Sequence, residues 1–303
     1  MPLIISCTRL AVGTCSIRSF LCFILPSPQV KFRLIVILRF ICTIFISALA
    51  VPALAESPPQ KIDLSQFPAD TIDRVIVPVP SEVFGVLDQL GNPNWQSELG
   101  PARTYPASPN RAQVALLLGT IIADGFVAVE AEDAERVKKI GRNVLTLAEA
   151  INVRKSVVTR SNSIIEKANA RQWNAVRREF DGALQDVHQA MVELDDEQLA
   201  QLVSLGGWLR GTEVLTSIID EKYSQDRAEL LYQPLLIDYF NQQINQMSAR
   251  LRGNPLVEEI QESLQRIGPL IKKSPADNIS SETVTEINSL SAKIVGLIRA
   301  RAG

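Results

Sequence analysis

Cysteine and histidine are scarce in this chain, and their scarcity excludes several kinds of site. All four cysteines of the 303 residues lie before residue 43, so the rest of the chain has neither disulfides nor cysteine ligands for a metal. The only histidine is His188, and the Glu-x-x-His pairs of di-iron bundles are absent, because position 185 is Gln. There is no Gly-x-Ser-x-Gly sequence. We therefore predict no metal, no cofactor and no catalytic residue.

Acidic residues are absent from the first 55 positions, whereas five basic residues occur there. From Lys31 the sequence KFRLIVILRFICTIFISALAVPALAES has a basic segment, an apolar segment and the site Ala53-Leu54-Ala55, as in a secretory signal peptide. We predict that residues 1–55 are a leader cleaved after Ala55, leaving no stable membrane anchor. The predicted location is the periplasm or cell envelope. A retained anchor is the alternative, because the apolar run is almost long enough to span a bilayer.

The first 29 residues are too long and too mixed in composition for an ordinary basic segment of a leader. Our hypothesis is that they are upstream sequence translated from an earlier start codon, with Val30 as the true initiator.

Removal of the leader changes the charge of the chain. It leaves 26 basic residues against 33 acidic ones, a net charge near −7. This balance disfavours nucleic acid and anionic lipid surfaces as partners. The partners that we expect are a protein or a small apolar ligand.

Strand patterns are also absent after residue 108, where the apolar spacing is helical almost throughout. We predict a proline-rich arm at 56–80 and a single α-helical domain at 81–303. The fold class is all-α, a multi-helix bundle of about eight antiparallel helices. Asn152 is expected to end one helix in the left-handed conformation. The main helices are predicted at about 109–130, 133–151, 154–168, 173–194, 195–223, 228–251, 254–273 and 281–301.

Two of these helices have small residues at helical spacing. Gly207 and Gly211 lie four positions apart in LVSLGGWLRG, with Gly206 beside them, and Ala115, Gly119 and Ala123 recur every four positions in the helix at 109–130. Glycine inside a helix costs about 0.5–1 kcal/mol relative to alanine, and close helix packing is a compensation. We predict that the two small-residue stripes pack together. The alternative is a ligand groove along the glycines. Gly125 lies outside the stripe, and the pattern predicts no role for it.

Asp124 stands in the apolar sequence TIIADGFVAV. One interpretation is that it faces water together with Gln113 and Thr120. The other is a buried carboxylate, which requires a cationic partner. For that case we expect an ion pair with Arg210 of the second small-residue helix.

Aromatic residues gather in the helices at 195–223 and 228–251, among them Trp208 and Tyr232. Pro234 is expected to kink the second of these helices. Core packing explains the aromatics, and a pocket at the kink for a small apolar molecule is the alternative.

These observations favour an exported, non-catalytic cell-envelope protein that acts as an interaction or scaffold module. The alternative is a periplasmic small-molecule-binding protein, with its pocket between the small-residue helices and the helix kinked at Pro234. An enzyme that acts through carboxylates has the least support, because nothing in the sequence selects a pair of acids.

Overall fold

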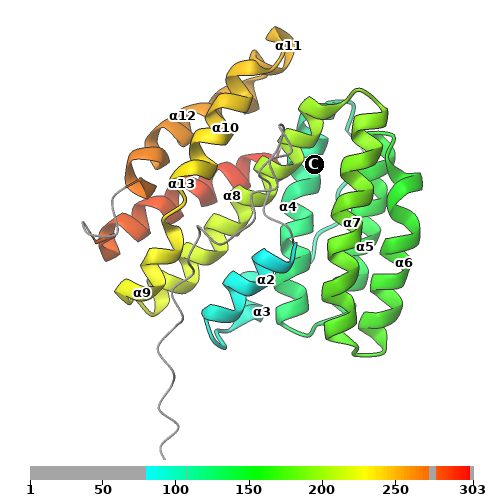
Figure 1. Ribbon diagram of the computed structural model, residues 1–303, viewed down its shortest axis with the longest axis horizontal. Helices are drawn as coiled ribbons and strands as arrows, with labels where there is room; N and C mark the ends of the chain where they lie inside the picture. The colour runs from blue at the N-terminus through cyan, green and yellow to red at the C-terminus, as the bar shows by residue number, and fades with distance from the viewer. Residues whose placement is uncertain (1–79, 107, 273–277, 301–303) are drawn as a thin grey trace, which may run out of the picture. The chain divides into compact units, whose positions relative to one another are not determined.

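Helices make up most of the chain that the structure, a computed structural model, describes: residues 80–106, 108–272 and 278–300. No strand occurs in these ranges, so the all-α class is confirmed. The predicted leader and all of the proline-rich arm except Pro80 lie outside them. The long helices are α4 (Arg111–Glu130), α5 (Ala134–Ala150), α6 (Arg154–Asn169), α7 (Trp173–Glu193), α8 (Glu197–Glu221), α10 (Pro234–Gln246), α12 (Pro255–Ile271) and α13 (Ser281–Ala300) (Figure 1).

The described residues contain more helices than the eight or so predicted, because several segments are short. These are α2 (Pro80–Gln89), α3 (Trp95–Glu98), α9 (Gln225–Ala228), the 3-10 helix η2 (Glu229–Leu231) and α11 (Ala249–Arg252).

The predicted continuous helix from 228 to 251, kinked at Pro234, is wrong. Pro234 begins α10 instead of bending a longer helix. A proline in the first turn loses no hydrogen bond, because the N–H groups there have no partner within the helix. Met247 then ends α10 in an extended conformation, with φ −62° and ψ 156°.

Helix α4 lies at the centre of the contacts among these helices. It packs most extensively against α8, and it also contacts α3, α5, α7 and α13. Its length and apolar composition would suffice to cross a membrane, but most of its residues are buried among the neighbouring helices, as in the core helix of a folded domain. This burial agrees with the sequence of α4, which places apolar residues around most of the helix.

Four consecutive helix connections, from α4 to α8, have the same backbone geometry. Each contains three residues, of which the middle one has a positive φ. The next residue donates its N–H to the carbonyl five positions earlier, at 2.9–3.0 Å, which is the Schellman ending of a helix. The left-handed conformation predicted for Asn152 is confirmed. The middle residues and their φ angles are Glu132 (51°), Asn152 (68°), Arg171 (55°) and Asp195 (53°).

A cluster of phenylalanines joins α2, α4 and α7. The ring centroid of Phe126 lies 4.7 Å from that of Phe84 and 4.8 Å from that of Phe180. Gly125 also belongs to this contact, since a Cβ there would lie 3.3 Å from the Phe180 ring. The small size of Gly125 therefore lets α7 pack closely, a role that its position in the sequence did not reveal.

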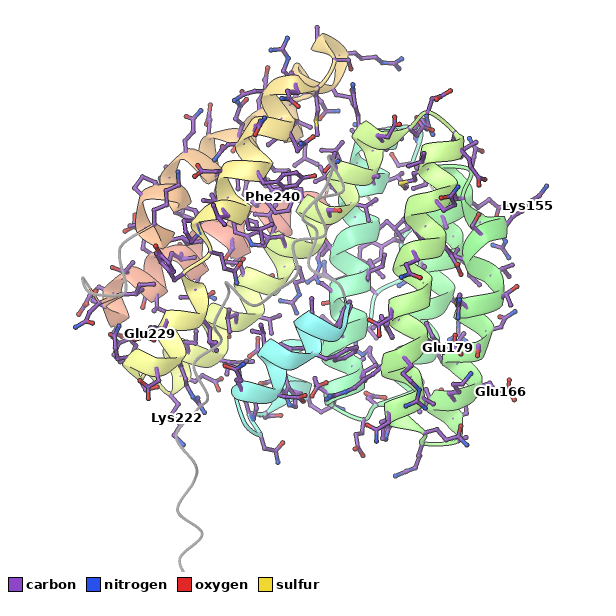
Figure 2. All side chains as sticks on the ribbon, in the orientation of Figure 1. Lys155, Glu166, Glu179, Lys222, Glu229 and Phe240 are labelled. Atoms are coloured by element: carbon purple, nitrogen blue, oxygen red, sulfur yellow. The ribbon has the colours of Figure 1, made fainter. Side chains whose placement is uncertain are left out.

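Helices α10 and α13 both contact α8, and α12 packs against both of them. Figure 2 shows Phe240 of α10 among these helices, where it is buried, whereas the charged side chains of Lys155, Glu166 and Lys222 are exposed. The described residues, from Pro80 to Ala300, all belong to one compact unit.

Candidate functional site

The contact between α4 and α8 positions the polar residues of the site. At Gly119 a Cβ would lie 1.8 Å from the carbonyl oxygen of Val203, and at Gly206 it would lie 2.1 Å from the carbonyl oxygen of Leu116. The Thr120 hydroxyl donates to the Leu116 carbonyl at 3.0 Å. The backbones of the two helices are thus in direct contact, which only glycine permits at Gly119 and Gly206.

The two predicted stripes contribute unequally to this contact. Gly207 lies beside Gly119, with a Cβ position 3.5 Å from the Gly119 carbonyl oxygen, and Ala115 is fully buried, whereas Ala123 is half-buried. The prediction that Gly211 packs in the stripe is wrong, because nothing lies within 4 Å of a Cβ there. Figure 1 shows α8 crossing α4 at an angle, and crossing helices approach closely over only a turn or two.

Asp124 and Arg210 lie at the edge of the close contact, and they form an ion pair. The Nε of Arg210 donates to Oδ1 of Asp124 at 2.8 Å, and the residues are only 3% and 8% exposed, Arg210 and Asp124 respectively. Asp124 does not face water together with Gln113 and Thr120, since all three are buried. A buried carboxylate and guanidinium at this distance compensate each other's loss of hydration.

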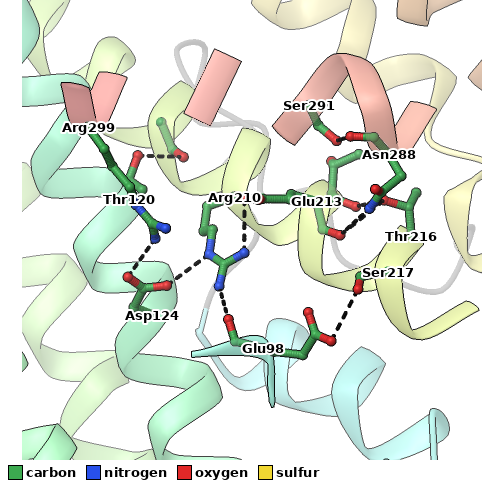
Figure 3. Close-up of polar contacts among 12 residues, drawn as sticks. Glu98, Thr120, Asp124, Arg210, Glu213, Thr216, Ser217, Asn288, Ser291 and Arg299 are labelled. Atoms are coloured by element: carbon green, nitrogen blue, oxygen red, sulfur yellow. Dashed lines mark hydrogen bonds and ion pairs between the residues drawn. The ribbon is translucent and has the colours of Figure 1, made fainter. Parts of the chain in front are cut away.

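Arg299, in the last turn of α13, is a second partner of Asp124 that the sequence analysis missed. Its guanidinium donates to Oδ2 of Asp124 at 2.7 Å across 175 positions of the chain (Figure 3). One carboxylate therefore lies between two arginines from different helices. No local pattern distinguishes Arg299 from other arginines on helix surfaces, so only the packing of α13 against α4 and α8 identifies it.

Arg210 has two more acceptors. Its guanidinium donates to Oε2 of Glu213 at 2.9 Å and to the main-chain carbonyl of Glu98. The Glu98 carboxylate accepts a hydrogen bond from Ser217 at 3.1 Å, and burial raises the pKa of that carboxyl group. Arg210 thus joins α4, α8 and the end of α3 in one buried network (Figure 3).

A cavity of about 200 Å³ adjoins this network. It is partly open to solvent, and its walls come from α4, α5, α8, α13 and the 99–106 segment that follows α3. Leu99, Ile121, Ile140 and Val295 supply apolar surface. The polar lining residues are Arg103, Tyr105, Asp124, Arg136, Lys139, Asn143, Glu213 and Arg299.

Helix α5 holds the 99–106 segment in place by three hydrogen bonds to its backbone. Arg136 donates to the carbonyl of Gly100 at 2.8 Å, and Lys139 donates to that of Ala102 at 2.9 Å. The amide of Asn143 donates to the carbonyl of Arg103 at 2.9 Å. These three side chains thus fix the segment that forms one wall of the cavity.

Trp208 and Tyr232 do not line this cavity. The Trp208 ring packs 5.4 Å from that of Phe240, and its Nε1 donates to Gln233 at 3.0 Å. Tyr232 is half-buried just after η2. The structure therefore separates these aromatic residues from Asp124, although Arg210 is only two positions from Trp208.

No group of three or more His, Cys, Asp or Glu side chains in the described residues is placed to hold a metal ion. No protein-family model, no curated protein and no solved structure matches this chain.

Proposed function

We propose that this protein is an exported, non-catalytic binding protein that holds a small molecule in the cavity beside Asp124. The observation that supports the proposal most is the cavity itself, because apolar walls with a few converging polar groups are typical of ligand sites. The binding function belongs to the class of the sequence-based alternative, but the proposed site lies at α4, α5 and α13 and not beside α10.

The two acidic side chains of the cavity favour binding over proton transfer. Asp124 and Glu213 each accept hydrogen bonds from arginine, so their carboxylates are held in ion pairs. A general acid or base instead needs a carboxyl oxygen within hydrogen-bond reach of the substrate. Fixed ion pairs orient donors around a ligand without exchanging protons with it.

The first experiment is native mass spectrometry of the untreated protein purified from its own cell envelope. We expect a small molecule bound to a chain whose mass corresponds to cleavage after Ala55. The variant Gly296→Leu, which adds a side chain to a residue lining the cavity, should lose that molecule. Gly211→Leu is the matched control, because it adds the same side chain at a helical glycine with open space away from the cavity.

Retention of the molecule by Gly296→Leu, or a purified chain without any bound molecule, would contradict the proposed function. In the second case the melting temperature would also be unchanged by every compound of a small-molecule panel, because a ligand that binds only the folded state raises it.

A role as an interaction or scaffold module is the second candidate. Leu235, in the first turn of α10, is 77% exposed, the highest value for a large apolar side chain among the described residues. The three-residue connections from α4 to α8 favour antiparallel neighbours, and such packing would give a partner a rigid surface. In the same mass spectrum this role predicts a second protein, which Leu235→Ser should remove.

A further inference from the structure

Three of the four carboxylate oxygens in the cavity beside Asp124 already accept a hydrogen bond from an arginine. Oδ1 of Asp124 accepts from Arg210 at 2.8 Å and Oδ2 accepts from Arg299 at 2.7 Å. Glu213 accepts from Arg210 at 2.9 Å. A ligand that donates hydrogen bonds would have to compete with these arginines, so the cavity is poorly suited to a cationic ligand.

Two donors at the cavity, in contrast, have no acceptor. The Nε of Arg299 is buried and makes no hydrogen bond. Tyr105 is 7% exposed, and its hydroxyl has no hydrogen-bond partner among the residues that the structure describes. Burial raises the pKa of Tyr105, so the hydroxyl keeps its proton at neutral pH and remains a donor. The Arg299 Nε is a buried donor without an acceptor, which is costly, and a bound acceptor would remove that cost. The Tyr105 hydroxyl is not among the buried atoms that lack a partner, so it adds an accessible donor without that cost.

The cavity also has an excess of positive charge. Among the described residues, Arg103, Arg136 and Lys139 have no carboxylate within ion-pair distance, although all three line the cavity. Arg136 and Lys139 donate to main-chain carbonyls, which do not cancel their charge. The lining of the cavity is therefore net positive in a chain whose net charge is negative, because its four cations outnumber its two carboxylates, Asp124 and Glu213.

We propose that the ligand is a small organic anion, a carboxylate with a short apolar body, and this inference rests on the proposed function. Its two oxygens would accept from Tyr105, Arg299 and the nearby cations, while the apolar body would contact Leu99, Ile121 and Val295. A cavity of about 200 Å³ is smaller than the 300–1,000 Å³ or so typical of drug-sized ligands. The ligand is therefore limited to a few carbon atoms or a single ring.

The test compares acids with neutral amides of the same shape. Binding of benzoate, benzamide, butyrate and butyramide to the full chain is measured by calorimetry and thermal shift, with inorganic phosphate as a further probe. We expect at least one acid to bind about ten-fold or more tightly than its amide, since hydrogen bonds to charged groups are the stronger ones. We also expect the affinity of that acid to fall with added salt.

Two variants locate the anion in the cavity. Tyr105→Phe removes only the hydroxyl, and Lys139→Gln removes the charge but keeps a donor for the Ala102 carbonyl. Each should weaken binding of the acid about ten-fold. Lys139→Gln should leave binding of the amide unchanged, whereas Tyr105→Phe should also weaken binding of the amide, though less, because the amide oxygen accepts from the same hydroxyl. Lys138→Gln is the control, because it removes the neighbouring charge outside the cavity and should leave both affinities as they are.

Each other outcome has a definite meaning. Equal affinities for acid and amide would overturn the anionic class and leave the binding function in place. Tighter binding of phosphate than of either acid would overturn the proposal that the ligand has an organic, apolar body. If no probe binds while the purified protein carries a small molecule, the class is wrong. If no probe binds and no molecule is present, the proposed function falls as well.

Discussion

The substitution Gly119→Ala should destabilise the protein strongly, although alanine is the better helix former. Its Cβ would lie 1.8 Å from the Val203 carbonyl oxygen, whereas ordinary contacts begin at 3.4 Å. The obstructing atoms, the Val203 carbonyl oxygen and the Gly207 nitrogen, are both backbone, so no side-chain rotation relieves the overlap. The two helices must separate by more than an ångström, and the tightest contact in the core must open.

The expected loss follows from two opposing terms. Alanine gains about 0.5–1 kcal/mol of helix propensity. Overpacking a tight core typically costs about 1–3 kcal/mol and occasionally more, and we use about 3–4 kcal/mol because the obstructing atoms are backbone. We expect a net loss of about 2–3 kcal/mol. For a domain of this size that lowers the melting temperature by about 4–12 °C. The assay is urea denaturation together with a thermal melt followed by circular dichroism.

Gly211→Ala is the matched control. It adds the same methyl group to a helical glycine of the partner helix α8, where the methyl group meets nothing within 4 Å. It should raise stability by about 0.5–1 kcal/mol, from helix propensity alone. A Gly119→Ala protein as stable as Gly211→Ala would refute the claim that backbone contact holds α4 against α8.

Three further predictions concern charges and backbone. Asp124→Ala and Arg210→Ala should each lower the free energy of unfolding by about 3–5 kcal/mol. The double variant should lose clearly less than the sum of the two, and additive values in a double-mutant cycle would contradict the coupling. A hydrogen bond from Lys167 helps lower the pKa of Glu179 from 4.5 to about 2, so this carboxylate adds stability above pH 4.5 that is lost as the pH falls toward 2. Melts of Glu179→Gln should therefore show a smaller loss across that range, and an unchanged loss would count against the assignment. Arg171→Gly relieves a positive φ of 55° and should raise stability by about 0.5–1 kcal/mol, whereas a lower melting temperature would argue against strain there.

The features that the sequence predicted are those that depend on nearby residues. Helical periodicity after residue 108 predicts an all-α fold, because apolar residues that recur every three or four positions form one face of a helix. The left-handed stop at Asn152 is equally local, since asparagine tolerates a positive φ. Asp195 is similar, because aspartate shares this tolerance, but Glu132 and Arg171 adopt the same conformation without a residue type that favours it. The Schellman hydrogen bonds of the connections compensate for the cost of the positive φ. Because they join backbone groups, no residue type in the sequence predicts them.

The candidate site depended on both levels. The position of Asp124 in an apolar helix raised the question of a buried charge, and Arg210 was the partner considered for it. Tertiary packing decided everything beyond that pair. The crossing of α4 and α8 placed Gly206 in the contact and left Gly211 outside it. The fold also brought Arg299 to Asp124 across 175 positions.

The cavity was beyond the reach of sequence reasoning for a physical reason. One wall is the 99–106 segment, which is fixed by hydrogen bonds to main-chain carbonyls, and every residue carries such a carbonyl. Residue order therefore determined that the chain is helical and where several of its helices stop. The crossing of the helices decided the rest: which glycine contacts a neighbouring helix, which arginine contacts Asp124, and where space is left for a ligand. Those contacts join positions that no local pattern relates.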